Sequence, residues 1–239
     1  MVYIRVLCVS YKKMSEIKSE IKKMQKELVL QIFETTKLSY ELQFHPIKFY
    51  LENSQKTILL CEKELEEKYN KYNEHIQYLM ELSELRKLTT KQLPDILNKS
   101  VYLTIYSMFE NEFFKLCESL QKIENLNLGP KDLKGGSYIA LCNNYIKKVI
   151  NVNLDRFKNE WEITEKYQQI RNLIAHNNGI IKPNNKEIIK FINTTEGISF
   201  DKNSLFINID SVTFLNMLID HLVKYLNDII DEIQIQKYK

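Results

Sequence analysis

Glycine and proline are scarce in this chain, and their placement constrains the fold more than any other feature of the sequence. The 239 residues include 5 Gly and 4 Pro, and the first glycine is Gly129. Because these two residues interrupt regular structure more strongly than any others, we expect long continuous helices. A hydrophobic fraction of 44% is sufficient for a globular core. The sequence therefore predicts an all-α fold and excludes a turn-rich β-sandwich.

Apolar residues in the N-terminal part recur in steps of three and four, which lays an apolar seam along one face of a helix. The first seam comprises Met14, Ile17, Ile21, Met24 and Leu28, and the second comprises Leu65, Tyr69, Tyr72, Ile76 and Leu79. We therefore expect residues 1–92 to form a coiled-coil-like extension of long helices. The two seams fit either a hairpin within the chain or contacts with another subunit.

The break between these two helices is expected at His45-Pro46, because the residue before a proline is pushed out of the α region. The second helix would then run from about residue 51 to residue 88. A lysine stripe on the first helix fits a solvated face better than an RNA contact, and it consists of Lys18, Lys22 and Lys26.

Residues 93–239 are expected to form a separate helical domain. Pro94 suits the first turn of a helix that is apolar nearly all round from Val101 onward, so this helix must be buried. Glu110 and Glu112 lie within it and need polar partners. Ser137 suits the start of the next helix.

The C-terminal part contains two more predicted helices with β structure between them. The first helix runs from about Asp155 to Asn177, where Asn177-Asn178-Gly179 suits a helix end. Alternating residues then predict a β-hairpin, or a small three-stranded flap, at about residues 186–210. The final helix is expected to begin at Asp210 or Ser211.

Charge and cysteine usage narrow the class of protein. A net charge of +3 is too small for a broad basic surface that coats nucleic acid, so any RNA contact would be local. No apolar run approaches the roughly 18 residues of a membrane span, and we expect no signal peptide. The four cysteines are far apart, so neither a disulfide framework nor a metal site is expected. These features indicate a cytoplasmic protein without a membrane partner.

Near the end of the predicted helix 155–177, one of only four arginines precedes one of four histidines by five positions. Asn172 and His176 are four residues apart and share a face, whereas Arg171 lies about 100° round the helix. The three polar groups therefore occupy adjoining sectors of one helix. We take Arg171, Asn172 and His176 as candidate catalytic residues. The candidate supporting residues are Glu110, Tyr167 and Asn177.

This motif resembles the Arg-x4-6-His signature of the HEPN superfamily (higher eukaryotes and prokaryotes nucleotide-binding), whose members are all-helical and often carry Asn after the Arg. Arg171, Asn172 and His176 match the signature residue by residue. The aromatic helix from Val101 to Leu120, and Trp161 before the motif, extend the resemblance to about residues 95–235. Asn178 stands where the HEPN toxins that pair with nucleotidyltransferase antitoxins carry a tyrosine.

The resemblance implies an HEPN-like helical bundle with metal-independent endoribonuclease activity in toxin, abortive-infection or other antiviral systems. It further implies a homodimer that brings two motifs together, and no cofactor. Histidine titrates near neutral pH and suits proton transfer, while the arginine guanidinium suits a phosphate bearing developing negative charge. Because the nucleophile is the 2′-hydroxyl, RNA is the implied substrate.

Two other classes of function fit the same sequence. One is binding alone, as a helical adaptor whose seams recruit a partner into a defence complex. The other is that of an antitoxin-like subunit that masks a toxin. The polar residues near position 176 would then simply cap the helix end, where an arginine also meets the helix dipole favourably.

Overall fold

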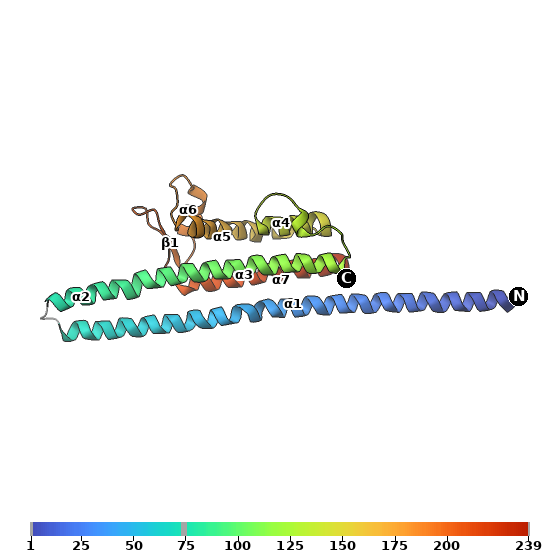
Figure 1. Cartoon of the computed structure of the whole chain (residues 1–239), viewed down its shortest axis with the longest axis horizontal. Helices are drawn as coiled ribbons and strands as arrows, with labels where there is room; N and C mark the ends of the chain where they lie inside the picture. The colour runs from blue at the N-terminus through green and yellow to red at the C-terminus, as the bar shows by residue number, and fades with distance from the viewer. Residues whose placement is uncertain (1, 73–75, 239) are drawn as a thin grey trace.

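The computed structural model describes the backbone of residues 2–72 and 76–238, with the side chains of these ranges from residue 17 onward. One helix, α1 (Val2–Lys71), contains 70 residues and runs along one side of the molecule (Figure 1). The chain then returns antiparallel to α1 in three consecutive helical segments, which are α2 (Ile76–Lys87), the π-helix η1 (Leu88–Gln92) and α3 (Leu93–Ile123). Pro94 lies in the first turn of α3, as predicted.

Shorter elements complete the fold. After α3 the chain forms the 3₁₀ turn η2 (Pro130–Asp132), α4 (Tyr138–Tyr145), the π-helix η3 (Ile146–Ile150), the 3₁₀ turn η4 (Asp155–Phe157), α5 (Lys158–Asn177) and α6 (Lys186–Asn193). Strands β1 (Ile198–Phe200) and β2 (Ile207–Ile209) pair antiparallel, and the chain ends with α7 (Val212–Ile233) and the π-helix η5 (Gln234–Tyr238). An all-α fold with a small hairpin before the last long helix is therefore confirmed.

Helix α3 is central to the core. It contacts α1 and α7 on one side and α4 and α5 on the other (Figure 1). Four of its aromatic residues are inaccessible to solvent, and they are Tyr102, Tyr106, Phe109 and Phe113. Tyr102 stacks on Phe214 of α7, with the ring centroids 5.7 Å apart. The prediction that this helix is buried therefore holds for most of its circumference, whereas Thr104, Ser107 and Asn111 form an exposed stripe along it.

The predicted helix break at His45-Pro46 is wrong, because α1 continues through Pro46 to Lys71. A proline inside a helix removes one hydrogen bond and crowds the preceding turn. Phe44 and Leu51, on either side of the proline, are each only 1% exposed and belong to the main core. Their packing holds both halves of the helix in one line, because tertiary burial outweighs a local preference of this size.

The reversal of the chain accordingly lies after Lys71 instead of at the proline, and the second predicted helix, 51–88, is divided between α1 and α2. Tyr40, Phe44 and Leu51 of α1 pack in the same hydrophobic cluster as α3 and α7. The middle of α1 therefore shares a core with the rest of the chain.

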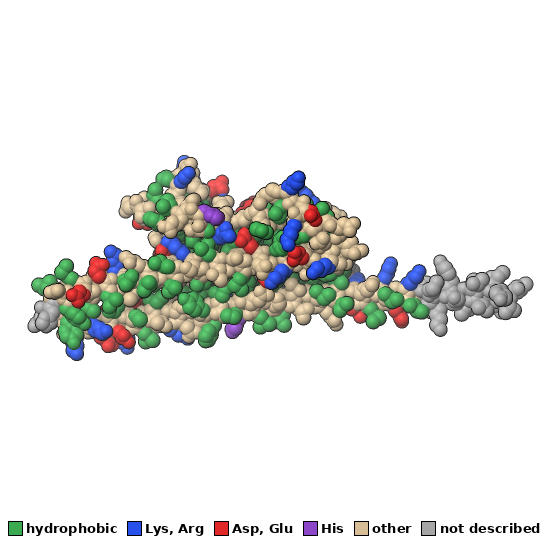
Figure 2. Space-filling view, in the orientation of Figure 1, with side chains coloured by type: hydrophobic (Ala, Val, Ile, Leu, Met, Phe, Trp, Pro, Cys, Tyr) green, Lys and Arg blue, Asp and Glu red, His purple; other side chains and the backbone are tan. Residues whose placement is uncertain are grey.

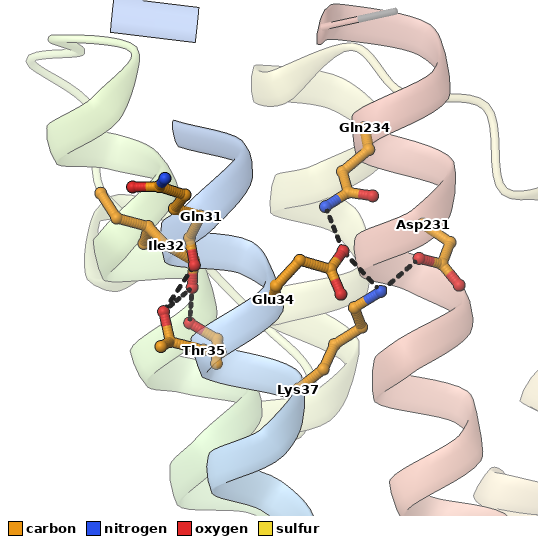
Figure 3. A network of polar contacts seen from close by, with 8 residues as sticks. Gln31, Ile32, Glu34, Thr35, Lys37, Asp231 and Gln234 are labelled. Atoms are coloured by element: carbon orange, nitrogen blue, oxygen red, sulfur yellow. Dashed lines mark hydrogen bonds and ion pairs between the residues drawn. The ribbon is translucent and has the colours of Figure 1, made fainter. Parts of the chain in front are cut away.

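Polar contacts fix α1 against α7 (Figure 3). Lys37 Nζ lies 2.8 Å from a carboxylate oxygen of Glu34 and 2.9 Å from Asp231 Oδ1, so it bridges the two helices. Gln234 Nε2 donates to Glu34 Oε1 at 3.1 Å. Further along, Lys48 pairs with Asp220 of α7 at 2.5 Å. These bonds set the register of the two helices, whereas the buried aromatic residues supply most of the stabilisation.

The outer face of α1 carries a second apolar seam, which faces solvent in the single chain. Its members occupy one continuous heptad register and are 49% to 67% exposed, and they are Ile17, Ile21, Met24, Leu28, Leu38, Leu42 and Phe49. We call this set the outer seam. It lies about half a helical turn from the buried seam of α1. Met14 of the first predicted seam lies outside the described side chains.

Several helix ends in the C-terminal part lie where local sequence signals predicted them. Ser137 caps α4 by accepting a hydrogen bond from Ala140 N at 3.4 Å. Asn178 and Gly179, at the end of α5, have φ values of 52° and 77°, in the left-handed region that asparagine and glycine tolerate. The β-type interpretation of residues 186–193 is wrong, because they form the amphipathic helix α6, and only the hairpin is present.

Within the described ranges, every helix is too short or too polar to cross a lipid bilayer.

Candidate functional site

The segment containing Arg171 lies in a groove between α3 and α5, next to the start of α4. These two helices run antiparallel (Figure 1), and the groove encloses about 640 Å³. Its lining comprises Ser107, Glu110, Asn111 and Phe114 from α3, Gln168, Arg171 and Asn172 from α5, and Lys131, Ser137 and Tyr138 from the intervening segment. A second hollow adjoins it along α3 and shares Ser107 and Asn111. The groove thus brings together three of the six predicted site residues.

Arg171 is held at the wall of this groove by two neighbours. Its Nη1 donates to Asn172 Oδ1 at 3.1 Å, and its Nη2 lies 3.6 Å from Glu110 Oε2. Burial raises the pKa of the Glu110 carboxyl, and the Arg171 guanidinium opposes this shift. The Arg171 side chain keeps 28% of its surface exposed. It can therefore meet an anion that enters the groove while Glu110 orients it.

His176 lies one helical turn beyond Asn172, close to the end of α5. Its side chain is exposed and makes no hydrogen bond to any residue that the structure describes. It does not line the groove itself. The imidazole is consequently accessible to a ligand that extends along α5 or to a second subunit. Lys99 of α3 lies near this helix end, where a Cβ built on Gly179 would be 3.7 Å from Lys99 Nζ.

The other predicted supporting residues lie outside the groove. Tyr167 is buried, its ring makes a perpendicular contact with Phe191 at 5.6 Å, and burial raises its pKa to about 12. Its backbone carbonyl accepts a hydrogen bond from Tyr102 at 2.8 Å, so Tyr167 serves the core. Asn177 is the exposed last residue of α5. Glu112 is buried and forms an ion pair with Lys115 at 2.7 Å, which supplies the partner that its burial requires.

Sequence reasoning did not assign seven of the ten groove-lining residues to the site, and three of the seven differ most in chemistry from the predicted residues. Phe114, Lys131 and Tyr138 reach it from α3, η2 and the first position of α4. The capping serine at position 137 indicates where α4 begins, but the sequence contains no signal for how the preceding loop folds back onto α5. Figure 2 shows basic and acidic side chains interspersed on the face shown, without a continuous basic surface.

A second histidine, His221 of α7, is partly buried beside α5. Its Nε2 lies 2.9 Å from Thr164 Oγ1, and its ring meets that of Tyr167 at 5.3 Å. Burial lowers the pKa of His221, and a hydrogen bond to the Glu160 backbone opposes this shift. The fold therefore favours the neutral form of this ring.

We expect His221 to make the protein less stable in mild acid. Below its unfolded pKa of about 6.5, the unfolded chain binds a proton that the folded chain does not, so the free energy of unfolding falls as the pH falls towards the depressed folded value. One such group contributes a slope of at most about 1.4 kcal/mol per pH unit. Chemical denaturation between pH 7 and pH 5 measures the slope, which should be shallower in His221→Gln. Equal slopes in the two proteins would contradict the assignment.

Among the described side chains, no cluster of three or more His, Cys, Asp or Glu residues could hold a metal ion. Cys61, Cys117 and Cys142 are free thiols. No protein-family model, curated protein or solved structure matches this chain.

Proposed function

We propose that this chain is a metal-independent endoribonuclease of the HEPN type, which acts in the cytoplasm as a toxin or as an antiviral, abortive-infection effector. One observation carries the proposal. Arg171 and Asn172 of the motif line the same groove as Glu110, and His176 is exposed one turn further along the same helix. A permanent cation and an exposed imidazole that can accept or donate a proton are thereby available to one ligand.

In the proposed reaction, the 2′-oxygen of a ribose attacks the adjacent phosphorus, and the bond to the 5′-oxygen of the next nucleotide breaks. One group must accept the 2′-hydroxyl proton, and another must donate a proton to the leaving 5′-oxygen. Arg171 would stabilise the negative charge that develops on the phosphorane, and Asn172 would help to orient the guanidinium or hold a phosphate oxygen. No metal or cofactor takes part.

We further propose that the active form is a homodimer. Each chain offers a single histidine at this site, so the two proton transfers are shared most simply between His176 and its counterpart in a second subunit. The exposed position of His176 at the end of α5 supports such an arrangement. An antitoxin or another defence protein would keep the enzyme inactive until it is needed.

The test uses the purified full chain, a single-stranded RNA and a DNA of the same sequence. We expect cleavage of the RNA alone, at the same rate with and without a metal chelator, because the nucleophile is supplied by the substrate. Cleavage of the DNA, or cleavage that stops with chelator and returns on adding a divalent metal, would point to different chemistry.

A second candidate function, that of a non-catalytic adaptor or antitoxin-like subunit, is favoured by the outer seam. Helices expose long apolar seams of this kind where another helix packs on them. Glu20, Glu27 and Glu41 border the seam and are exposed, which would suit a partner helix with basic flanks. If the chain is an adaptor or antitoxin-like subunit, Leu42→Lys would abolish its biological effect in cells, and His176→Ala would leave that effect intact. The nuclease proposal predicts that His176→Ala abolishes it.

A further inference from the structure

Tyr138 is an exposed aromatic residue at the edge of the groove. It is the first residue of α4, and 63% of its surface is accessible. The start of α4 is tied to α5, because Ser137 Oγ donates to Gln168 Oε1 at 3.1 Å while accepting from Ala140 N. The backbone that carries the tyrosine is thus held beside the groove, and the side chain is largely exposed.

The neighbours of Tyr138 leave a ring face available. Phe114 meets it almost perpendicularly, with centroids 6.0 Å apart and an interplanar angle of 81°. A perpendicular contact covers at most one face of the tyrosine ring. Lys131 Nζ lies 5.1 Å from the centroid of Phe114 and forms an exposed ion pair with Glu118 at 3.4 Å. An aromatic platform with a cation beside it therefore stands at one end of the groove.

The remaining groove residues add charge and hydrogen-bonding groups. Arg171 supplies a second cation, and Asn111, Gln168 and Asn172 supply amide groups that can donate and accept. About 640 Å³, with a further hollow alongside, falls in the usual range for pockets that hold small organic ligands. An aromatic face, separate cations and several amides together suit a base linked to a phosphate, and proteins bind single-stranded nucleic acid with this combination.

We propose that the groove holds single-stranded RNA with one base stacked on Tyr138 and an adjacent phosphate at Arg171. This inference rests on the proposed ribonuclease function and adds a binding residue to it. Phe114 supports the tyrosine ring from the side, and Lys131 meets a second phosphate. Stacking uses the face of a base, so this position accepts different bases with little preference among them.

The test measures binding of a fluorescently labelled 12-nucleotide RNA that contains 2-aminopurine, using the full chain with His176→Ala so that the RNA stays intact. Adding Tyr138→Ala should weaken binding about tenfold or more, because one stacked base contributes on that order, and should reduce quenching of 2-aminopurine. Tyr138→Phe keeps the ring and should bind like the parent. Tyr69→Ala removes another exposed tyrosine, on α1, and serves as the matched control. Thermal melting establishes that each variant is folded.

The outcomes separate the two proposals. Unchanged affinity and quenching in Tyr138→Ala, with binding still lost in Arg171→Ala, would overturn the stacking position and leave the nuclease proposal standing. No RNA binding by the parent protein would overturn both. A separate experiment measures the binding of adenosine monophosphate to the same protein. If this nucleotide bound as tightly as the RNA, the groove would be a site for free nucleotides and the proposal would fail.

Discussion

The variant His176→Ala is expected to cut RNA about 10²- to 10⁴-fold more slowly than the unchanged protein, because proton transfer by a positioned side chain contributes on this order. The protein should keep its fold. His176 is exposed and has no side-chain hydrogen bond within the described residues, and exposed substitutions of this kind change the free energy of unfolding by about 0.5 kcal/mol or less. Single-turnover cleavage rates and a thermal melt measure the two quantities.

The matched control for this experiment is His45→Ala. His45 is another exposed histidine, on α1, and its removal should leave the cleavage rate unchanged. Arg171→Lys adds a second comparison, since lysine keeps the charge but loses the paired donors that suit a phosphate. Equal cleavage by the His176→Ala protein would remove His176 from the mechanism.

Phe44→Ala is expected to destabilise the protein by about 3–5 kcal/mol, which is the usual cost of removing a buried phenylalanine side chain. Phe44 is 1% exposed and packs where α1 meets the main core. Such a loss is a large fraction of the total stability of a typical domain. Chemical denaturation followed by far-UV circular dichroism measures it.

Phe49→Ala is the matched control, because this phenylalanine lies on the same helix, just beyond the proline, and is 64% exposed. It should cost about 0.5 kcal/mol or less in the single chain. If the two substitutions cost equally little, α1 would be a detachable extension. If Phe49→Ala cost as much as Phe44→Ala, the outer seam would be covered in solution.

Local signals in the sequence were reliable at the caps of α4 and α5, where the residue type decides the backbone conformation. Ser137 marked the start of α4, and Asn178 with Gly179 marked the end of α5, because capping and left-handed φ values depend on the residue itself. Pro46 failed as a signal because the burial of Phe44 and Leu51 is a tertiary effect that local preference does not contain. The β-type prediction for residues 186–193 was wrong because a short apolar segment is compatible with a strand and with an amphipathic helix.

The candidate site was only partly predictable for the same reason. Helical periodicity placed Arg171, Asn172 and His176 on adjoining faces of one helix, and the structure brings Glu110 to within 3.6 Å of Arg171. Tyr167, however, points into the core, which the helical phase alone did not decide. Tyr138 and Lys131 reach the groove through the loop between α3 and α4, and a loop path depends on packing that the sequence pattern does not express.

The chemical ends of the RNA fragments test the central claim most directly. Attack by the 2′-oxygen leaves a 2′,3′-cyclic phosphate on one fragment and a 5′-hydroxyl on the other. Mass spectrometry of the products should detect these ends with the unchanged protein in the presence of chelator, and should detect few or none with His176→Ala. Fragments carrying 3′-hydroxyl and 5′-phosphate ends, or the same cyclic products at equal rates from His176→Ala, would contradict the proposed function.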